Sequence, residues 1–296
     1  MRRPAAVGAA CLALVAAAAA VLPGGAGAQP PLEVHKVDEA HFSPVPDRPV
    51  FVLVVGLDGG RPGVVGDRAD AIHLIGVNAA AGAGTILNIP RDTYVDLPGR
   101  GRAKINDAYF YGGPELMATT VEALTGADVA FVLATRFEPF VAMVNEAGGV
   151  PVDVPFAMND RNSGAVFPQG RVDMDGRAAL AFARNRYIPG GDIRRSEHQA
   201  LLILSALTRL RGEAPGAAAA ARYLAILGRH VSVTGVAPVE LYRLGRLALT
   251  LDPGRVRSVT MPSRVGQAGA LSVVFVGAGA DGLFADLRDD AVLQSH

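Results

Sequence analysis

The chain has 296 residues, with 28 Lys or Arg and 28 Asp or Glu, so its formal net charge is zero. A neutral chain lacks the basic face that general nucleic-acid binding requires, and we expect no nucleic-acid partner. The single cysteine, Cys11, excludes an internal disulfide and a cysteine-based metal cluster. The length fits one large α/β domain or two smaller ones.

The N-terminal residues 1–28 have the composition of a secretory signal peptide or an N-terminal membrane anchor. Arg2 and Arg3 precede an uncharged run over residues 4–22, and Ala26-Gly27-Ala28 fits a small-residue cleavage site. The weakly hydrophobic alanine core favours a cleaved signal, but an apolar run of about 18 residues can also span a bilayer. Either alternative places the chain at the extracytoplasmic face of the cell membrane or in the cell wall.

Residues 29–47 are rich in proline and polar side chains and are predicted to be a linker, followed by one domain over residues 48–296. The first predicted strand, residues 50–56, is an apolar, β-branched run between Pro49 and a Gly-Gly pair. Two similar strands are expected over residues 71–77 and 85–89.

The rest of the chain alternates between helical and strand patterns. A helix with apolar residues at helical spacing is expected to end at Gly126, a residue suited to a helix C-terminus. In chain order we predict helix 103–125, strand 129–134, helix 138–147, strand 150–154, helices 175–183, 197–211 and 238–251, and strands 256–261 and 273–276. The pattern predicts one α/β domain with a central mixed sheet flanked by helices on both faces.

Charged residues are scarce, and many of them gather at the ends of these elements. The clusters are Asp58 with Arg61, Arg68 with Asp70, Arg91 with Asp92, Lys104, and Arg184, Arg186, Asp192 and Arg195. Charge placed at the ends of buried elements indicates a site for a multiply anionic ligand, bound together with a divalent cation.

Strand direction predicts that three of these residues lie together. If the first three strands are antiparallel neighbours, as their short connections favour, then Asp58, Asp70 and Arg91 reach one rim of the sheet. A pair of carboxylates completed by water and substrate phosphate suits Mg²⁺. Arginine makes fork-like contacts to phosphate oxygens.

The second arginine group suggests a ligand of pyrophosphate size. Arg184 and Arg186 would point to one side of an extended segment, and a turn over residues 189–191 could fold Asp192 and Arg195 back toward them. Each cluster also has a plainer interpretation. Asp58 could start a turn, Arg91 could pair with Asp92, Lys104 could extend into solvent, and Arg184 and Arg186 could lie at a solvated helix end.

Six ordered motifs give the chain a resemblance to the LytR-CpsA-Psr family of bacterial cell-envelope enzymes, densely over residues 48–211. They are Gly56-Leu57-Asp58 with Arg61; Arg68-Ala69-Asp70; Ile89-Pro90-Arg91-Asp92-Thr93; Lys104-Ile105-Asn106 through Gly112-Gly113; Gly148-Gly149-Val150; and Leu180 to Arg186 with Asp192 to Gln199.

The resemblance implies a phosphotransferase that moves a glycopolymer from a polyprenyl-pyrophosphate carrier to peptidoglycan at the membrane surface. By motif, Asp58 and Asp70 would hold Mg²⁺. The residues implied to contact the pyrophosphate are Arg68, Arg91, Lys104, Arg184, Arg186 and Arg195. The lipid tail would enter a groove lined by apolar sheet and helix residues.

The acceptor hydroxyl needs a general base, for which Asp192 and Asp92 are the candidates. Asp192 is preferred because it lies among the arginines. An alternative role for Asp192 is to orient Arg186 or Arg195 through an ion pair. Arg91 and Asp192 are therefore the predicted catalytic residues.

The chain departs from the family pattern at His198, where the family usually carries arginine, and this change would remove one phosphate or structural contact. Ala71 and Asn88 stand where the family often has Thr and Ser. Two functions compete with transfer. With water as the acceptor the same site would be a polyprenyl-pyrophosphate hydrolase, and without catalysis it would be a binding protein for polyprenyl phosphates or anionic glycans.

Overall fold

The computed structural model describes residues 32–37, 48–59, 66–188, 191–213 and 231–294. The predicted signal or anchor, residues 1–28, lies outside these ranges. Among the helices of the described residues, none combines the length and the apolar character that crossing a membrane requires.

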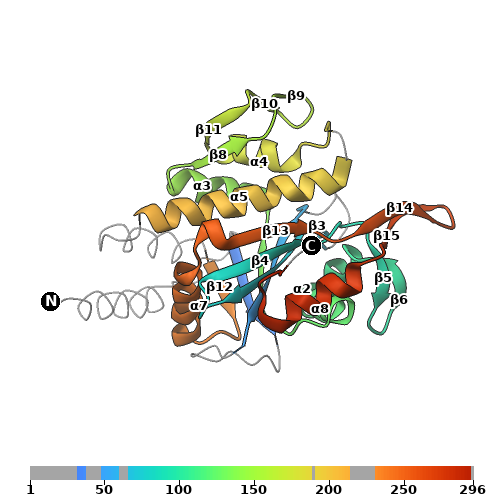
Figure 1. Ribbon diagram of the computed structural model, residues 1–296. Helices are drawn as coiled ribbons and strands as arrows, with labels where there is room; N and C mark the ends of the chain where they lie inside the picture. The colour runs from blue at the N-terminus through green and yellow to red at the C-terminus, as the bar shows by residue number, and fades with distance from the viewer. Residues whose placement is uncertain (1–31, 38–47, 60–65, 189–190, 214–230, 295–296) are drawn as a thin grey trace.

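A seven-stranded mixed sheet forms the centre of the molecule, as the sequence predicts (Figure 1). The strands, in their order across the sheet, are β12 (Val231–Thr234), β1 (Leu32–Lys36), β7 (Val129–Thr135), β2 (Val50–Leu57), β3 (Ala69–Asn78), β4 (Ala83–Asn88) and β13 (Val256–Thr260). Strands β2, β3 and β4 are antiparallel neighbours, which confirms the expected pairing. The outer neighbours β7 and β13 run parallel to β2 and β4, so both end at the same rim of the sheet as those strands.

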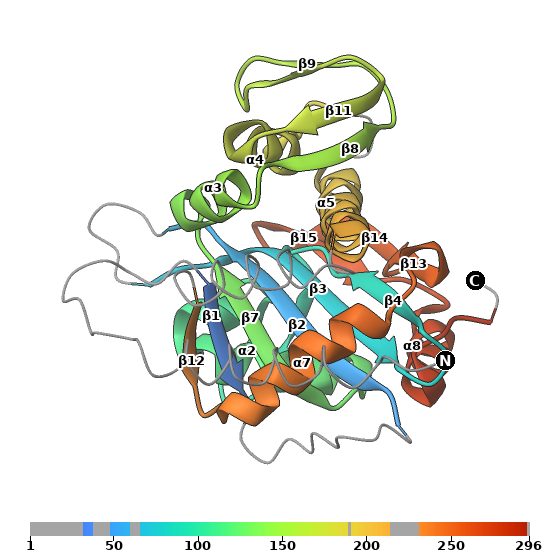
Figure 2. The same ribbon diagram turned by 90° about the vertical axis from the view of Figure 1, so that its left-hand side faces the viewer.

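Helices cover both faces of the sheet because its central strands are apolar on both sides. Helices α2 (Asp107–Thr125) and α8 (Ala280–Asp290) pack on the face that carries Leu53 and Leu74. Helices α5 (Gly191–Glu213) and α7 (Pro238–Thr250) pack on the opposite face, and α7 crosses in front of the strands in Figure 2. The predicted three-layer α/β arrangement is confirmed.

A smaller layer covers the outer side of α5. It contains α3 (Phe137–Glu146), α4 (Gly176–Arg184) and the strand pairs β8 (Val150–Val154) with β11 (Gly170–Met174) and β9 (Met158–Asp160) with β10 (Ala165–Phe167). Its own apolar core includes Val152, Met174 and Phe182, and Leu202 of α5 joins this core. Helix α5 therefore lies between the sheet and this layer, which Figure 1 places above the sheet.

Strands β9, β10, β11 and β12 were not predicted, and two hairpins and strand β1 also differ from the predicted elements. Hairpins β5 (Tyr94–Leu97)–β6 (Gly101–Lys104) and β14 (Ser263–Ala268)–β15 (Leu271–Val276) lie beside each other at one end of the molecule (Figure 1). Because β6 occupies the start of the helix predicted at 103–125, α2 begins only at Asp107 and ends as expected before Gly126. Strand β1 falls inside the segment 29–47 that was predicted as linker, and it pairs with β7 and β12. That part of the segment therefore belongs to the sheet.

Candidate active site

Asp58, Asp70 and Arg91 meet at one rim of the sheet, as the strand directions predict. Asp58 directly follows β2, and Asp70 lies where a bulge shifts the register between β2 and β3. Arg91 follows the end of β4 and donates a hydrogen bond to Asp70 Oδ1 through its Nη1. All three side chains are partly exposed, which leaves this rim accessible to a ligand.

Arg68 joins this rim through main-chain and side-chain bonds. Its amide donates to Asp58 Oδ1 at 3.0 Å, and this bond joins the residue that follows β2 to the residue that precedes β3. Its Nε donates to Asp107 Oδ1 at 2.8 Å, and this bond raises the pKa of Arg68, which keeps the guanidinium charged. Asp107, the first residue of α2, was not among the predicted site residues, since its sequence context differs little from that of any acidic first turn.

Arg195 reaches the same rim from α5. Its side chain is buried, and its Nη2 donates to the main-chain oxygen of Asp70 at 2.9 Å. The two residues are separated by 125 positions in the chain. Charged groups from distant segments therefore converge at Asp70, as the sequence analysis expected.

The loop that carries Arg91 is fixed by main-chain bonds to the segment before α2. Asn106 donates its amide to Arg91 O at 3.2 Å, and Asn106 O accepts from the Ala69 amide at 3.4 Å. On the same loop, Asp92 Oδ1 lies 3.0 Å from Lys104 Nζ. Lys104 is therefore near the rim, as expected, but its charge is balanced by Asp92. The ion pair gives Asp92 a structural role and leaves it a weaker candidate for the general base.

The structure corrects the expected arrangement of Arg184 and Arg186. Helix α4 extends through Arg184, and the backbone becomes extended only at Asn185. The two arginines therefore do not share one side of an extended segment. Arg184 is exposed, and its Cζ lies 4.9 Å from the centroid of the Phe137 ring on α3. Arg186 is exposed in the segment that follows the helix.

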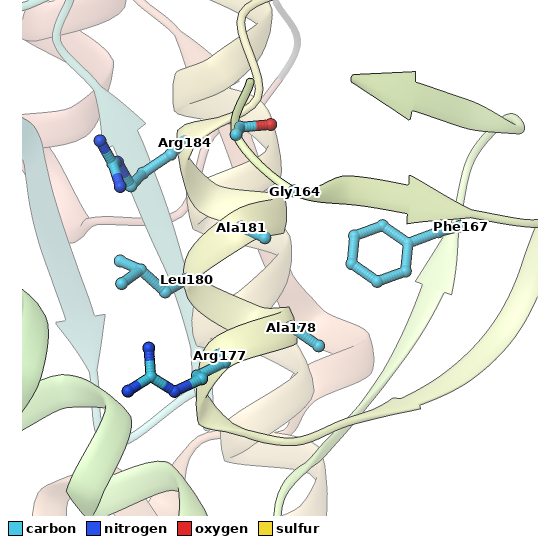
Figure 3. A pocket seen from close by; sticks show the side chains of 8 residues that line it. Gly164, Phe167, Arg177, Ala178, Leu180, Ala181 and Arg184 are labelled. Atoms are coloured by element: carbon cyan, nitrogen blue, oxygen red, sulfur yellow. The ribbon is translucent and has the colours of Figure 1, made fainter. Parts of the chain in front are cut away.

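Arg184 also lines a cavity of about 350 Å³ between α4 and the β9–β10 hairpin. Figure 3 shows Arg177, Leu180 and Arg184 on one side of α4, while Phe167 faces the other side. This cavity and the Phe137 ring both belong to the smaller layer, so the structure places Arg184 in that layer. For Asp192, the structure gives the backbone at the start of α5, and its side chain lies outside the described atoms. Arg61 is also outside the described residues.

His198, which stands where an arginine was expected, lies in an apolar environment away from solvent. Its ring stacks on Phe182 with centroids 4.8 Å apart and is tilted against Phe156 at 5.8 Å. Among the described residues neither ring nitrogen has a hydrogen-bond partner, and burial lowers the pKa of His198 to about 4. The ring is therefore neutral at pH 7 and joins the core of the smaller layer.

We expect His198→Leu to raise the melting temperature, more so at pH 5 than at pH 7. Leucine removes two buried nitrogens without partners, which favours the variant at any pH. The His198 pKa is about 4 in the folded chain and about 6.5 in the unfolded chain. The folded state therefore keeps its full stability above pH 6.5 and loses stability as the pH falls from 6.5 toward 4. At pH 5 this linkage costs the wild type about 2 kcal/mol.

Thermal melts of both proteins at the two pH values measure this difference. An equal shift at both values would contradict the assigned pKa of His198. Burial also lowers the pKa of His73 to about 4. The variant should therefore keep the part of the acid-induced loss of stability that comes from His73.

His73 belongs to a buried polar network beneath the rim that the sequence analysis missed. Asn88 Nδ2 donates to Ser258 Oγ at 3.0 Å, so its Oδ1 accepts from His73 Nδ1 at 2.8 Å. The network connects β3, β4 and β13. Asn88, noted in the sequence as a departure from serine, is thus a bridge between strands, and it stiffens the strand ends that carry the rim.

A second network holds the end of the loop between β2 and β3. Arg136, which follows β7, lies 2.7 Å from Glu33 Oε1 of β1 and 2.7 Å from Asp67 Oδ2. Asp67 precedes Arg68, so β1 contributes to the position of the rim. This contact is a further reason to assign β1 to the domain.

Comparison with known proteins shows the family to which the chain belongs. Residues 28–276 match the LytR_cpsA_psr family. The chain belongs to this family. A polyisoprenyl-teichoic acid–peptidoglycan teichoic acid transferase TagU of Oceanobacillus iheyensis is 36% identical over 165 residues, 53% of this chain and 50% of the relative. The protein of the same name from Enterococcus faecalis is 34% identical over 158 residues, 52% of each chain. The chain thus spans about half the length of the curated relatives it matches.

Solved structures of this family share the fold. TagT bound to LIIa-WTA superposes with a TM-score of 0.70 at 22% identity, over 86% of this chain and 96% of that one. A LytR-Csp2A-Psr enzyme from Actinomyces oris gives 0.67 at 22% identity, over 89% and 98%. TagT (YwtF) with bound octaprenyl pyrophosphate lipid gives 0.63 at 21% identity, over 84% and 92%. At this level of identity the likeness establishes the α/β fold of the LytR_cpsA_psr family.

Proposed function

We propose that this protein transfers a glycopolymer, as its phosphoester, from a polyprenyl-pyrophosphate carrier to a hydroxyl group of peptidoglycan. The observation that carries the proposal is the convergence of Asp58, Arg68, Asp70, Arg91 and Arg195 on one rim from three separate parts of the chain. The printed names of the TagU relatives, and the ligands in the titles of the TagT structures, support the same activity.

The rim suits a pyrophosphate because it concentrates guanidinium groups that are held in place. Arg91 is oriented by Asp70, and Arg68 by Asp107, so neither must lose much side-chain freedom when it binds a ligand. Arg195 adds a third guanidinium from α5. Arg184, Arg186 and Lys104 complete the proposed pyrophosphate contacts from the edge of the site.

The carboxylates Asp58 and Asp70 fit Mg²⁺ as the cofactor. Both are hard oxygen donors on adjacent strands at the rim, and a magnesium ion commonly takes one or two carboxylates together with water and substrate phosphate. Bound Mg²⁺ would neutralise part of the pyrophosphate charge.

The α5/α7 face of the sheet offers an apolar surface for the lipid tail. Val54, Ile75 and Leu133 on the central strands are only partly buried, whereas Leu53 and Leu74 on the opposite face are fully buried. Leu204 of α5 and Leu244 of α7 are also partly buried beside them. This surface begins at the rim, so a pyrophosphate bound there can lay its polyprenyl chain along it.

In the proposed reaction the acceptor hydroxyl oxygen attacks the phosphorus atom that carries the glycan. The bond from that phosphorus to the bridging oxygen breaks, polyprenyl phosphate leaves, and the hydroxyl proton passes to a base, for which Asp192 is the candidate. The rim arginines stabilise the charge on the phosphoryl and bridging oxygens. Catalysis of this kind depends on positioning and charge, which the arginines held in place at the rim supply.

We further infer that the protein acts outside the cytoplasm, at the membrane surface, where polyprenyl-linked donors and peptidoglycan meet. The support is the sequence of residues 1–28, which can serve as a cleaved signal or as an anchor. Mass analysis of the N-terminus of protein recovered from the cell envelope distinguishes the two.

The activity is tested with purified protein, Mg²⁺ and a polyprenyl-pyrophosphate glycan, with and without peptidoglycan fragments. We expect phosphate-linked product only when the acceptor is present, and no product after chelation with EDTA. Release of polyprenyl phosphate without acceptor would instead identify a hydrolase. Unchanged substrate that nevertheless binds would identify a binding protein and overturn the catalytic proposal.

A further inference from the structure

Two adjacent aromatic rings with a guanidinium group at each end form a row that leads away from the rim across the α2 side of the molecule. Cζ of Arg68 lies 5.0 Å from the centroid of the Phe110 ring, and the rings of Phe110 and Tyr111 meet edge to face with centroids 5.2 Å apart. Cζ of Arg100, in the turn of the β5–β6 hairpin, lies 5.0 Å from the Tyr111 ring. We call these four residues the arginine–aromatic row.

Local backbone geometry fixes the inner half of the row. Helix α2 is interrupted at Gly112 and Gly113, and Gly113 has a φ of +60°, so Phe110 and Tyr111 end a separate first turn. The Phe110 ring lies over Gly66, where a Cβ atom would come within 2.8 Å of it. Gly66 also has a φ of +120°, which disfavours any side chain there. The ring can therefore pack closely against Gly66 in the loop that carries Arg68.

The outer half of the row is open to solvent. Tyr111 is 45% exposed, which is unusual for a large aromatic side chain, and Arg100 is exposed as well. Arg100 Nη2 donates to Tyr111 O at 3.3 Å, so the guanidinium is oriented although it lies on the surface. Exposed aromatic side chains beside an oriented arginine are typical of binding surfaces.

The β5–β6 hairpin continues this surface toward a second set of the same groups. Tyr94 lies opposite Lys104 in the strand register, and Cζ of Arg102 lies 4.9 Å from the Tyr94 ring. Tyr94 also meets Phe275 of β15 edge to face, with centroids 6.2 Å apart. The hairpin thus presents rings and cations on the face that is turned away from its buried residues Val95 and Leu97.

From this geometry we propose that the arginine–aromatic row binds the acceptor, a glycan strand that carries carboxylate groups, on its way into the site. The inference rests on the proposed function, in which that strand is peptidoglycan. Flat aromatic rings can pack against the apolar face of a sugar ring, and guanidinium groups can pair with carboxylates. The row offers both kinds of group, with neighbouring groups 5.0 to 5.2 Å apart, and it ends at Arg68 on the rim.

The direction of the reaction favours the acceptor over the donor as the ligand of this row. In phosphoryl transfer the attacking and leaving oxygens lie roughly in line across the phosphorus atom. The leaving group carries the lipid, whose proposed surface is on the α5/α7 face of the sheet. Helix α2 and the β5–β6 hairpin lie on the opposite side (Figure 1), so an acceptor held there approaches from the side away from the leaving group.

The test is co-sedimentation of the whole 296-residue chain with peptidoglycan sacculi stripped of attached polymers. We expect the double variant Arg100→Ala/Tyr111→Ala to need about tenfold more sacculi for half-maximal binding than the wild type. Tyr111→Phe keeps the ring and should bind like the wild type. Arg246→Ala removes an exposed arginine from α7, on the other side of the sheet, and is the matched control.

A parallel measurement of binding to a polyprenyl-pyrophosphate glycan in detergent micelles separates the two substrates. Unchanged donor binding with weakened sacculus binding supports the proposal. Unchanged sacculus binding by the folded double variant overturns it, and so does a loss confined to the donor, which would assign the row to the donor glycan. Because neither measurement requires turnover, failure of this inference is distinguishable from failure of the proposed transferase activity.

Discussion

Replacing Arg91 with alanine is expected to lower kcat/KM for glycopolymer transfer by about 10³-fold while leaving the fold intact. Arg91 lies at the rim, where Asp70 orients its guanidinium toward the site proposed for the pyrophosphate. An arginine that stabilises phosphoryl charge in the transition state contributes an effect of this order. Its side chain is 18% exposed, and loss of the charged hydrogen bond to Asp70 should cost about 2 kcal/mol, which a folded domain can tolerate.

The measurement is a transfer assay on Arg91→Ala and Arg91→Lys, with thermal melts of both. Lysine keeps the charge but cannot make two parallel contacts to phosphate, so it should recover only part of the activity. Arg171→Ala, on the exposed strand β11, is the control for loss of one positive charge. Full activity in a folded Arg91→Ala protein would show that this rim is not the site of phosphoryl transfer.

The sequence predicted the rim well because its position depends on local rules. Short connections between apolar, β-branched runs favour antiparallel neighbours, and the ends of such neighbours must share an edge of the sheet. Asp58, Asp70 and Arg91 follow from this rule alone, and the structure joins Arg91 to Asp70 directly. Arg68 and Arg195 stood among the charged clusters, and the family motifs assigned them to the pyrophosphate. Their contacts with Asp58 and Asp70 are seen only in the structure.

The secondary-structure predictions that were wrong have a common physical cause. In each case contacts with other elements, rather than the local sequence, determined the structure of the segment. Strand β1 sits in a Pro-rich, polar stretch and is a strand only because β7 and β12 pair with it on both sides. The β14–β15 hairpin contains Arg264, Gly266 and Gln267, so its first strand lacks an apolar pattern. Helix α4 runs one residue further than predicted, and that single residue moves Arg184 from an extended segment to a helix end.

His198 illustrates the same limit for a side chain. From the sequence it is a partly charged residue in an arginine-rich segment, and we expected a lost phosphate or structural contact. Its actual neighbours, Phe156 and Phe182, come from other elements of the smaller layer and make it a neutral core residue. The fold explains the substitution as a packing change within that layer, which a single sequence does not reveal.

Replacing Arg195 with methionine is expected to reduce both stability and activity, because this residue connects α5 to the rim. The buried guanidinium donates to Asp70 O at 2.9 Å, and hydrogen bonds from a charged group contribute about 2 kcal/mol to stability. Methionine has a similar length and no charge, so it fills much of the space without replacing the bond. Asp70 would then lose its tie to α5, and the rim would lose one of its positive charges.

Chemical denaturation and transfer kinetics of Arg195→Met separate these effects. We expect a loss of about 2 kcal/mol in the free energy of unfolding and a fall of about 10²-fold in kcat. Arg195→Lys should recover more stability than activity, because a single ammonium can reach a carbonyl oxygen but cannot match the fork of a guanidinium. If Arg195→Met retained wild-type kcat despite the loss of stability, Arg195 would be a structural link between α5 and β3. The pyrophosphate would then depend on Arg68, directly before β3, and on Arg91 of the β4–β5 loop, because α5 would supply only their support.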